Sequence, residues 1–509
     1  MVVAQVLSLL AERIDSSRVV AFLLLTAGML ALAFKFYSRG LRTKSAQVEK
    51  KWFGKLDPDL WYLDGKAYDF APFADRHPGG LHALWLGKGR DCSGLFHSYH
   101  LRLPSQDVLN KYLAPEDKQP KIDTANREET EEFYGRQKFT FDKNGFYSVL
   151  KQQVVQHFDD KGIDWKSDNL HWLYAVLNVV LQLSSLVAIL ILAPVYGFHW
   201  STVLAALLHA FGRSMTIVQT THGGSHFALS RNPAVNRWWY RIGTVLIALW
   251  APPNWDLQHV VAHHIYTNEW PFDSDSAFPI KSIAANQRRF WYHKYQHIYS
   301  WLLYAFMTPL VQLNAIKELV TGKQVTFRMR YDAPGLREEG IVCSILGLCY
   351  QIMPLVLVPF GQIWHVWFLT TLAHSLFFAL QFVINHEIDE VHDERDASRT
   401  ESPKPLPSQL PQRSTDWGAY QCEESFSFAP HSRLALHLSG GLNTQIEHHL
   451  FPGVHFSHYK DIAEITRRVA NKFGVPYRST PTLPAAWRKH YNLLKNPPTA
   501  VKRDTKKSK

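Results

Sequence analysis

Two long stretches of this chain contain no charged side chain, and they constrain its fold more than any other feature. Residues 169–212 and 340–386 contain no Asp, Glu, Lys or Arg. A helix needs about 20 apolar residues to cross the hydrocarbon core of a bilayer, so each stretch has room for two crossings. The sequence therefore predicts two helical hairpins in a membrane and argues against an ordinary soluble enzyme.

Proline and glycine mark the turn inside each charge-free stretch. The predicted crossings are residues 171–192, 200–220, 341–358 and 365–384, with turns at 194–197 and near 359–361.

A shorter apolar segment, residues 19–34, precedes a run of Lys and Arg residues, so its C-terminal side is expected to be cytosolic. It could be a cleaved signal or transit peptide, but no small-residue cleavage pattern follows it, and we favour a membrane anchor. We place two further apolar stretches, 242–255 and 295–316, at the membrane surface. Five crossings would leave the C-terminus in the cytosol, where its last residues, KKSK, resemble a dilysine address for retrieval to the endoplasmic reticulum.

Cysteine and histidine content limits the metal chemistry open to the chain. The four cysteines lack the paired spacing of a disulfide framework or a thiolate metal site, whereas there are 26 histidines. Any metal must therefore be held by ligands other than thiolates.

The charged and aromatic segment before the first hairpin has the size of a small module. It contains DGKAYDF at 64–70 and HPGG at 77–80, and this stretch resembles cytochrome b5. The resemblance implies His77 and His100 as the axial ligands of haem b, with His97 as the nearest alternative to His100. Two neutral imidazoles saturate the iron, which suits electron transfer rather than oxygen chemistry. The alternative is a decayed module with surface histidines.

Three histidine clusters lie beyond the predicted crossings. They comprise His222 and His226; His259, His263 and His264; and His448 and His449. Histidines four apart on a helix share one face, so a cluster can direct two imidazoles at one point. A single such pair is commonly structural. Three clusters that the predicted crossings place on one side of the membrane favour a site for two metal ions.

These boxes and the N-terminal module together resemble the front-end fatty acyl desaturases, over about residues 50–495. The resemblance rests on sequence segments such as QHVVAHHIYTN and GGLNTQIEHHLFPGVHFSHY. It implies a mainly α, multi-span membrane fold with a small α+β cytochrome b5-like domain. It also implies a non-haem di-iron centre that uses O2 to remove two hydrogens from an acyl chain. The implied metal ligands are His222, His226, His259, His263, His264, His386, His448 and His449, with His386 matched to related membrane desaturases. His293 and His297 share the four-residue spacing, but we do not favour them as ligands.

Two positions depart from the pattern of membrane desaturases. The family's first box usually has Asp where this chain has Gly223, which leaves open what orients a ligating imidazole there. Gln445 stands where other membrane desaturases have a histidine. A neutral amide is a poor ligand for oxidised iron, so Gln445 either leaves a position to water or bonds to a ligand. In the family, glutamine here accompanies insertion of a double bond on the carboxyl side of an existing one.

We predict five segments along the chain. They are an N-terminal anchor (1–45), a cytochrome b5-like domain (46–118), a solvated linker without chemistry (119–168), the desaturase domain (169–495) and a basic tail (496–509).

The predicted activity is insertion of a cis double bond into long-chain polyunsaturated acyl chains, with delta-5 or delta-4 preferred over delta-6. Electrons would pass from NADH through a separate cytochrome b5 reductase to the haem and then to the two irons. The alternatives are a lipid hydroxylase or sphingoid-base desaturase on the same scaffold, and an inactive membrane-anchored haem carrier. We expect the endoplasmic reticulum membrane rather than a plastid membrane, and no nucleic-acid partner. Chain length, acyl carrier and oligomeric state stay open.

Overall fold

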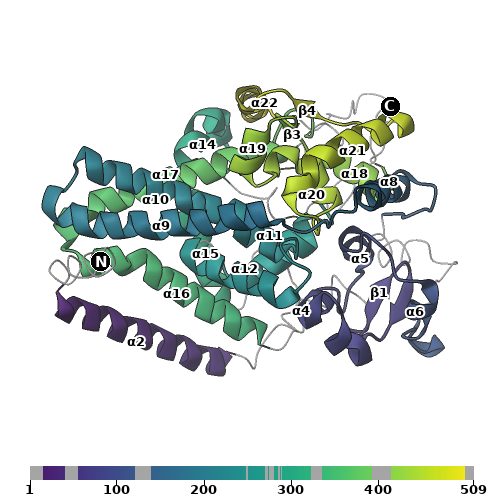
Figure 1. Cartoon of the computed structure of the whole chain (residues 1–509), viewed down its shortest axis with the longest axis horizontal. Coiled ribbons are helices and arrows are strands. Elements are labelled where there is room, and N and C mark those ends of the chain that lie inside the picture. Colours follow the sequence, from purple (N-terminus) through teal and green to yellow (C-terminus); the bar gives the residue numbers. More distant parts are fainter. Residues whose placement is uncertain are drawn as a thin grey trace, which may run out of the picture.

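The computed structural model describes most of the chain, which is mainly helical (Figure 1). The described residues are 15–40, 56–120, 139–247, 250–269, 273, 280–284, 287, 289–321, 335–392 and 414–498. The KKSK terminus, the basic residues at 42–51 and the acidic run at 128–132 lie outside them.

Four long apolar helices form the membrane part. They are α9 (Asn169–Tyr196), α10 (Trp200–Thr216), α16 (Leu336–Leu357) and α17 (Phe360–Phe382). Among the described residues, these four helices are long and apolar enough to cross a membrane, when α10 is taken together with the short segments that extend it to Ser225. This confirms both predicted hairpins. Small and branched residues such as Ile189, Ala206 and Val366 are buried where α9, α10 and α17 meet. Leucines on the outer faces stay exposed, as expected of helices that contact hydrocarbon.

Helix α2 (Ser16–Gly40) lies along α16 (Figure 1). The Arg18 guanidinium, at the start of α2, donates to the carbonyl of Val356, near the end of α16, so the two helices run antiparallel. Leu23 and Leu24 of α2 are 59% and 68% exposed, as in a lipid-facing helix. Its described apolar part, Ser16–Ala31, is shorter than the other four spans, so a fifth crossing stays a prediction.

The two apolar stretches assigned to the membrane surface form short helices. The first gives α12 (Pro233–Ile247) and α13 (Pro252–Trp255), and the second gives α14 (Gln296–Tyr304) and α15 (Met307–Thr321). None of these is among the four helices long enough to span a bilayer.

The N-terminal module is a small α+β unit. Strands β1 (Trp61–Leu63) and β2 (Lys66–Tyr68) form an antiparallel hairpin, and Asp64 and Gly65 both have positive φ, as a tight two-residue turn requires. The short helices of the module follow: η1 (Ala71–Arg76), α4 (Gly80–Trp85), α5 (Ser93–Tyr99), α6 (Gln106–Asn110) and η2 (Glu116–Lys118).

The C-terminal region forms a helical cap at the end of the long helices (Figure 1). Its elements are η7 (Val383–Asn385), α18 (Trp417–Glu424), α19 (Arg433–Ser439), η9 (Leu442–Thr444), α20 (Gln445–Leu450), η10 (Phe456–His458), α21 (Tyr459–Phe473) and α22 (Leu483–Lys495). Two short strands, β3 (Ser427–Phe428) and β4 (Ser479–Thr480), pair in parallel within it.

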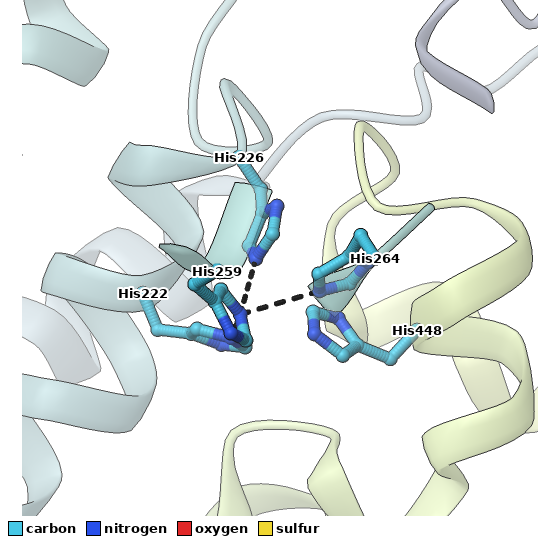
Figure 2. Close-up of side chains that lie close together, drawn as sticks. All are labelled: His222, His226, His259, His264 and His448. Carbon is cyan, nitrogen blue, oxygen red and sulfur yellow. Dashed lines mark hydrogen bonds between the residues drawn. The ribbon is translucent and has the colours of Figure 1, made fainter. Parts of the chain in front are cut away.

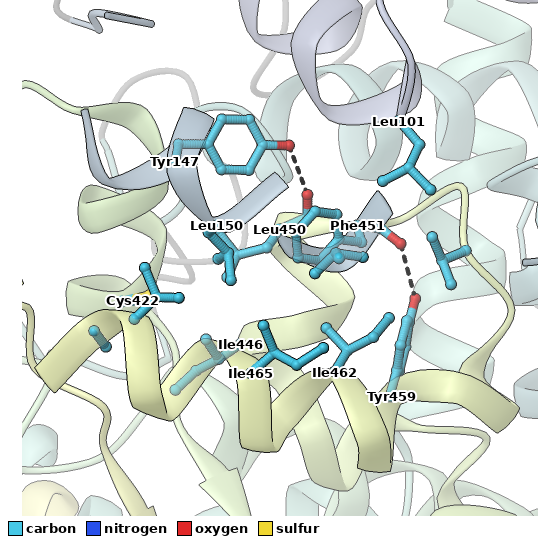
Figure 3. Packing of buried hydrophobic residues seen from close by; sticks show 14 of the residues in the cluster. Leu101, Tyr147, Leu150, Cys422, Ile446, Leu450, Phe451, Tyr459, Ile462 and Ile465 are labelled. Carbon is cyan, nitrogen blue, oxygen red and sulfur yellow. Dashed lines mark hydrogen bonds between the residues drawn. The ribbon is translucent and has the colours of Figure 1, made fainter. Parts of the chain in front are cut away.

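Helix α8 (Phe146–Lys161) corrects one prediction. The sequence assigned it to a solvated linker, but Leu150, Val154 and Phe158 are buried in the cluster that also contains α20 and α21. The Tyr147 hydroxyl donates to the carbonyl of Leu450 at 2.8 Å (Figure 3). The solvated interpretation of this helix was wrong, because its apolar face has a partner about 300 residues away along the chain.

Candidate metal centre

Five buried histidines converge on one point at the end of α10 (Figure 2). Each offers a nitrogen, and these five nitrogens lie within 4.8 Å of one another: His222, His226, His259, His264 and His448. The Nε2 of His259 is 3.0 Å from the Nε2 of His222, 3.0 Å from that of His226 and 3.2 Å from that of His264. Two nitrogens bonded at right angles to one ion, each at about 2.1 Å, would be separated by about 3.0 Å. We call these residues the five-histidine group.

Three further buried histidines form a second cluster beside the first. The nitrogens of His263, His386 and His449 lie within 4.8 Å of one another, and we call them the three-histidine group. The ring of His264 stacks on that of His449, with centroids 4.3 Å apart, so the two groups are adjacent. All eight predicted ligands therefore fall in one of two neighbouring groups, whereas His293 and His297 are in neither.

A π-helical segment determines how His259, His263 and His264 are divided between the two groups. Segment η4 (Asp256–His263) is π-helical, and the backbone N–H of His264 donates to the carbonyl of His259 at 3.0 Å. The expectation that residues four apart converge was therefore wrong here: His259 joins His264, five residues on, while His263 points to the other group. Such π-turns are rare and occur mostly at functional sites. Segment η3 (Ile217–Thr221), which leads into His222 on α11 (His222–Ser225), is also π-helical.

Each member of the three-histidine group has a partner for its outer nitrogen, Nδ1. His263 bonds to the Asp273 carboxylate at 2.9 Å, His386 donates to the Glu424 carbonyl at 2.9 Å, and His449 donates to the Gln421 side-chain oxygen at 2.9 Å. A partner on Nδ1 fixes the tautomer, so that Nε2 carries the lone pair that binds a metal.

Gln445 lies beside His386. Its amide nitrogen donates to Nε2 of His386 at 2.9 Å, and its oxygen accepts from the Asn385 amide at 3.0 Å. In this arrangement Gln445 contacts a member of the three-histidine group through a hydrogen bond. This is one of the two roles expected from the sequence.

The chemistry of these side chains fits metal ions. Nε2 of His448 and Nε2 of His449 are buried and have no hydrogen-bond partner among the described residues, an arrangement that costs free energy unless a ligand is present. Burial, with a further contribution from neighbouring imidazoles, lowers the pKa well below its usual range for His259, His264, His448 and His449. Neutral imidazole is the form that binds metal.

The glycine in the first box is packed against Leu229. A Cβ atom on Gly223 would lie 2.9 Å from the Leu229 side chain. The outer nitrogen of His226 instead lies 2.6 Å from the hydroxyl of Tyr99, in the N-terminal module. Sequence reasoning missed Tyr99, Asp273 and Gln421, because each lies outside the histidine motifs, at 127, 10 and 28 residues from its histidine.

The N-terminal module brings His77 and His100 together. Their rings are 6.0 Å apart, and each Nδ1 donates to a backbone carbonyl, at Gly80 and Phe96 respectively. This leaves both Nε2 atoms for a metal. Burial lowers the pKa of His100 to about 4, which keeps the ring neutral. His97, the alternative, bonds to the Asp64 carboxylate at 3.0 Å and stacks on Phe141.

Comparison with known protein families identifies the family to which the chain belongs. The model of the fatty acid desaturase family matches residues 163–481, and a cytochrome b5-like haem/steroid binding domain matches residues 46–116. The chain belongs to the fatty acid desaturase family. This desaturase is a membrane oxidoreductase that uses haem in its cytochrome b5 domain and two non-haem irons.

Its similarity to known desaturases extends along most of the chain. It is 30% identical to an acyl-lipid (8-3)-desaturase of Physcomitrium patens, covering 86% of this chain and 88% of that protein. It is 26% identical to a probable delta(5) fatty acid desaturase C of Dictyostelium discoideum, covering 88% and 96%. It is 29% identical to a chloroplastic acyl-lipid (7-3)-desaturase of Chlamydomonas reinhardtii, covering 86% and 81%.

Proposed function

We propose that this desaturase is a front-end enzyme that inserts a cis double bond into polyunsaturated acyl chains, on the carboxyl side of an existing double bond. The observation that carries the proposal is the pair of buried histidine groups with the haem domain docked against one of them. The similarity to a delta(5) desaturase supports delta-5 over the delta-4 alternative. Similarity to acyl-lipid desaturases supports a lipid-bound acyl substrate.

The two histidine groups would hold one iron each. The five-histidine group supplies more nitrogens than the three-histidine group, so the iron held by the three-histidine group would have fewer imidazole ligands. When bound, the irons supply the oxidising power that removes hydrogen from an unactivated C–H bond. The chain buries all eight imidazoles, which excludes bulk water, and hydrogen bonds at Nδ1 fix the tautomers of the three-histidine group.

The acyl chain would approach past an apolar cluster between the metal centre and the long helices. Trp250, Trp255 and Phe378 pack together there, and Trp255 stacks on His259 with ring centroids 4.1 Å apart. Phe382 extends the same cluster to His222, at 6.2 Å between ring centroids. Aromatic rings at this position give a methylene chain apolar contact directly beside the metal ligands.

We also propose a cellular setting for the enzyme. We place the histidine groups and the haem domain on the cytosolic face of the endoplasmic reticulum, where NADH and a cytochrome b5 reductase would supply electrons through His77 and His100. Helix α2 would act as an additional membrane anchor, because it runs antiparallel to α16 along most of that helix. The boundaries 46–118 for the haem domain and 169–495 for the desaturase domain are part of this proposal, with α8 packed into the latter.

Expression in yeast that lacks polyunsaturated lipids tests the function. Cells would be fed acyl chains of 18 to 22 carbons that differ in their existing double bonds, and mass spectrometry would give the position of each new bond. We expect new bonds on the carboxyl side of an existing one. New bonds only toward the methyl end would contradict the front-end assignment. A hydroxylated lipid, or a product from sphingoid bases alone, would favour those alternative enzymes.

A further inference from the structure

Tyr99 of the haem domain contacts the metal centre directly. It is the last residue of α5 and immediately precedes His100, whose ring faces that of His77 at 6.0 Å. Its hydroxyl lies 2.6 Å from Nδ1 of His226, and the two rings are nearly parallel, 6.2 Å apart. One side chain therefore connects the segment that carries a haem ligand to a member of the five-histidine group.

The segment around Tyr99 is fixed by the desaturase domain. The carbonyl of His97 accepts from the Lys151 ammonium at 2.6 Å, and the Tyr147 hydroxyl lies 3.2 Å from the same carbonyl. The same ammonium is 3.4 Å from the His100 carbonyl. Helix α8 therefore binds the backbone on both sides of Tyr99, which gives this helix a role that its sequence did not suggest.

The other side of α5 packs closely against the residue after His264. A Cβ atom on Gly94 would lie 2.7 Å from the side chain of Ile265, the residue that follows His264. A glycine at this position allows α5 to lie this close to the segment that carries His263 and His264.

A buried carboxylate contacts the neighbouring helix α4. Nε2 of His82 lies 2.8 Å from the Asp256 carboxylate at the start of η4, and the Arg237 guanidinium binds the same carboxylate at 3.1 Å. Asp256 is only 2% exposed, so these contacts are screened little by solvent. The haem domain is thus docked on the segment that carries His259 and His263.

We propose that Tyr99 is a positioning residue that couples the haem to the metal centre: it orients His226 and links it to His100 through one hydrogen bond and the adjoining backbone. In each transfer the ferrous haem iron loses one electron to become ferric, and an iron of the centre gains that electron. The tyrosine is neither oxidised nor deprotonated. The proposal rests on the proposed function, because it requires haem at His100 and iron at His226.

Haem reoxidation in the purified full-length enzyme tests this role. The reduced enzyme would be mixed with O2 and an acyl substrate, and the haem absorption followed by stopped flow. A bis-imidazole haem has no site for O2, so its reoxidation reports transfer to the metal centre. We expect Tyr99→Phe to slow reoxidation by roughly tenfold or more, because the variant loses the hydrogen bond between the haem domain and His226. Its haem spectrum, midpoint potential and iron content should equal those of the wild type.

Two matched tyrosine variants provide controls. Tyr62 lies in the same domain, and its hydroxyl accepts from the Asp57 backbone at 2.7 Å, so Tyr62→Phe should reoxidise at the wild-type rate. Tyr459 places its hydroxyl 3.5 Å from Nδ1 of His448 but has no link to a haem ligand. Tyr459→Phe can therefore lower product formation through His448, but it should slow haem reoxidation less than Tyr99→Phe does.

Three results would overturn the proposal: wild-type reoxidation in Tyr99→Phe, equal slowing in Tyr459→Phe, or loss of iron from Tyr99→Phe. The last would mean that Tyr99 retains the metal rather than coupling it to the haem. A wild-type enzyme whose haem is not reoxidised, and which forms no product, would contradict the proposed function instead.

Discussion

The five-histidine group and the three-histidine group are held in place by different means. In the three-histidine group, each outer nitrogen bonds to a group of the desaturase domain: Asp273, the Glu424 carbonyl or Gln421. In the five-histidine group, the outer nitrogen of His226 bonds to Tyr99 of the haem domain. The three-histidine group is therefore held by hydrogen bonds within the desaturase domain. The five-histidine group is held partly by the haem domain that is docked on it.

The largest effects should come from removing a ligand, and the two groups should respond differently. His449→Ala leaves two histidines in its group, whereas His264→Ala leaves four in the other. We expect both variants to lose product formation at least 100-fold, but His449→Ala to lose more non-haem iron, measured per haem in the purified protein. Equal iron loss would remove the distinction between the groups.

Removing a haem ligand should abolish NADH-driven desaturation and leave both histidine groups intact. His100→Ala should lose the bis-imidazole spectrum, while its non-haem iron content stays at the wild-type value. His97→Ala is the matched comparison, because His97 bonds to Asp64. A normal spectrum in His100→Ala together with a lost spectrum in His97→Ala would show that the haem ligand has been misassigned.

Asp273→Asn tests the carboxylate that supports the three-histidine group. Asparagine keeps the shape but removes the charge that polarises His263, and we expect a loss of roughly 10- to 100-fold in product formation. Asp168→Asn is a suitable control, because Asp168 caps α9 and bonds to His171, which is in neither group. If product formation falls equally in both variants, the effect is not specific to the metal centre.

Gln445→Ala should have a smaller effect, about tenfold on product formation, because it removes the side chain that contacts Nε2 of His386 but no imidazole. Gln445→Asn, with its amide one methylene closer to the backbone, should not restore the rate. Full activity in Gln445→Ala would mean that the amide has no part in the three-histidine group.

Gly223→Ala should have the smallest effect. Its new methyl group would meet only the tip of the Leu229 side chain, which can shift, so we expect a stability loss of about 1 kcal/mol and nearly unchanged product formation. A large loss of activity, with thermal stability unchanged, would show that this position acts on the five-histidine group directly.

Local patterns in the sequence predicted the long helices and the histidine boxes because both depend on short-range features. Charge-free stretches marked α9, α10, α16 and α17, and the motif around His77 and His100 marked the haem domain. All eight predicted ligands come together in the structure.

Long-range contacts explain what the sequence could not reveal. The π-helical η4 shifts the pairing of His259 from the fourth to the fifth following residue, and no composition signal marks that change. Tyr99 is 127 residues from His226, so no periodic pattern connects them. Helix α8 was misread because amphipathic sequence indicates an apolar face but not the surface that covers it.

The ratio of non-haem iron to haem in the purified full-length chain tests whether the two histidine groups form a di-iron centre. We expect two non-haem irons for each haem, one in each histidine group. A preparation that contains haem iron alone, after expression with ample iron, would contradict the di-iron centre and favour a membrane-anchored electron carrier.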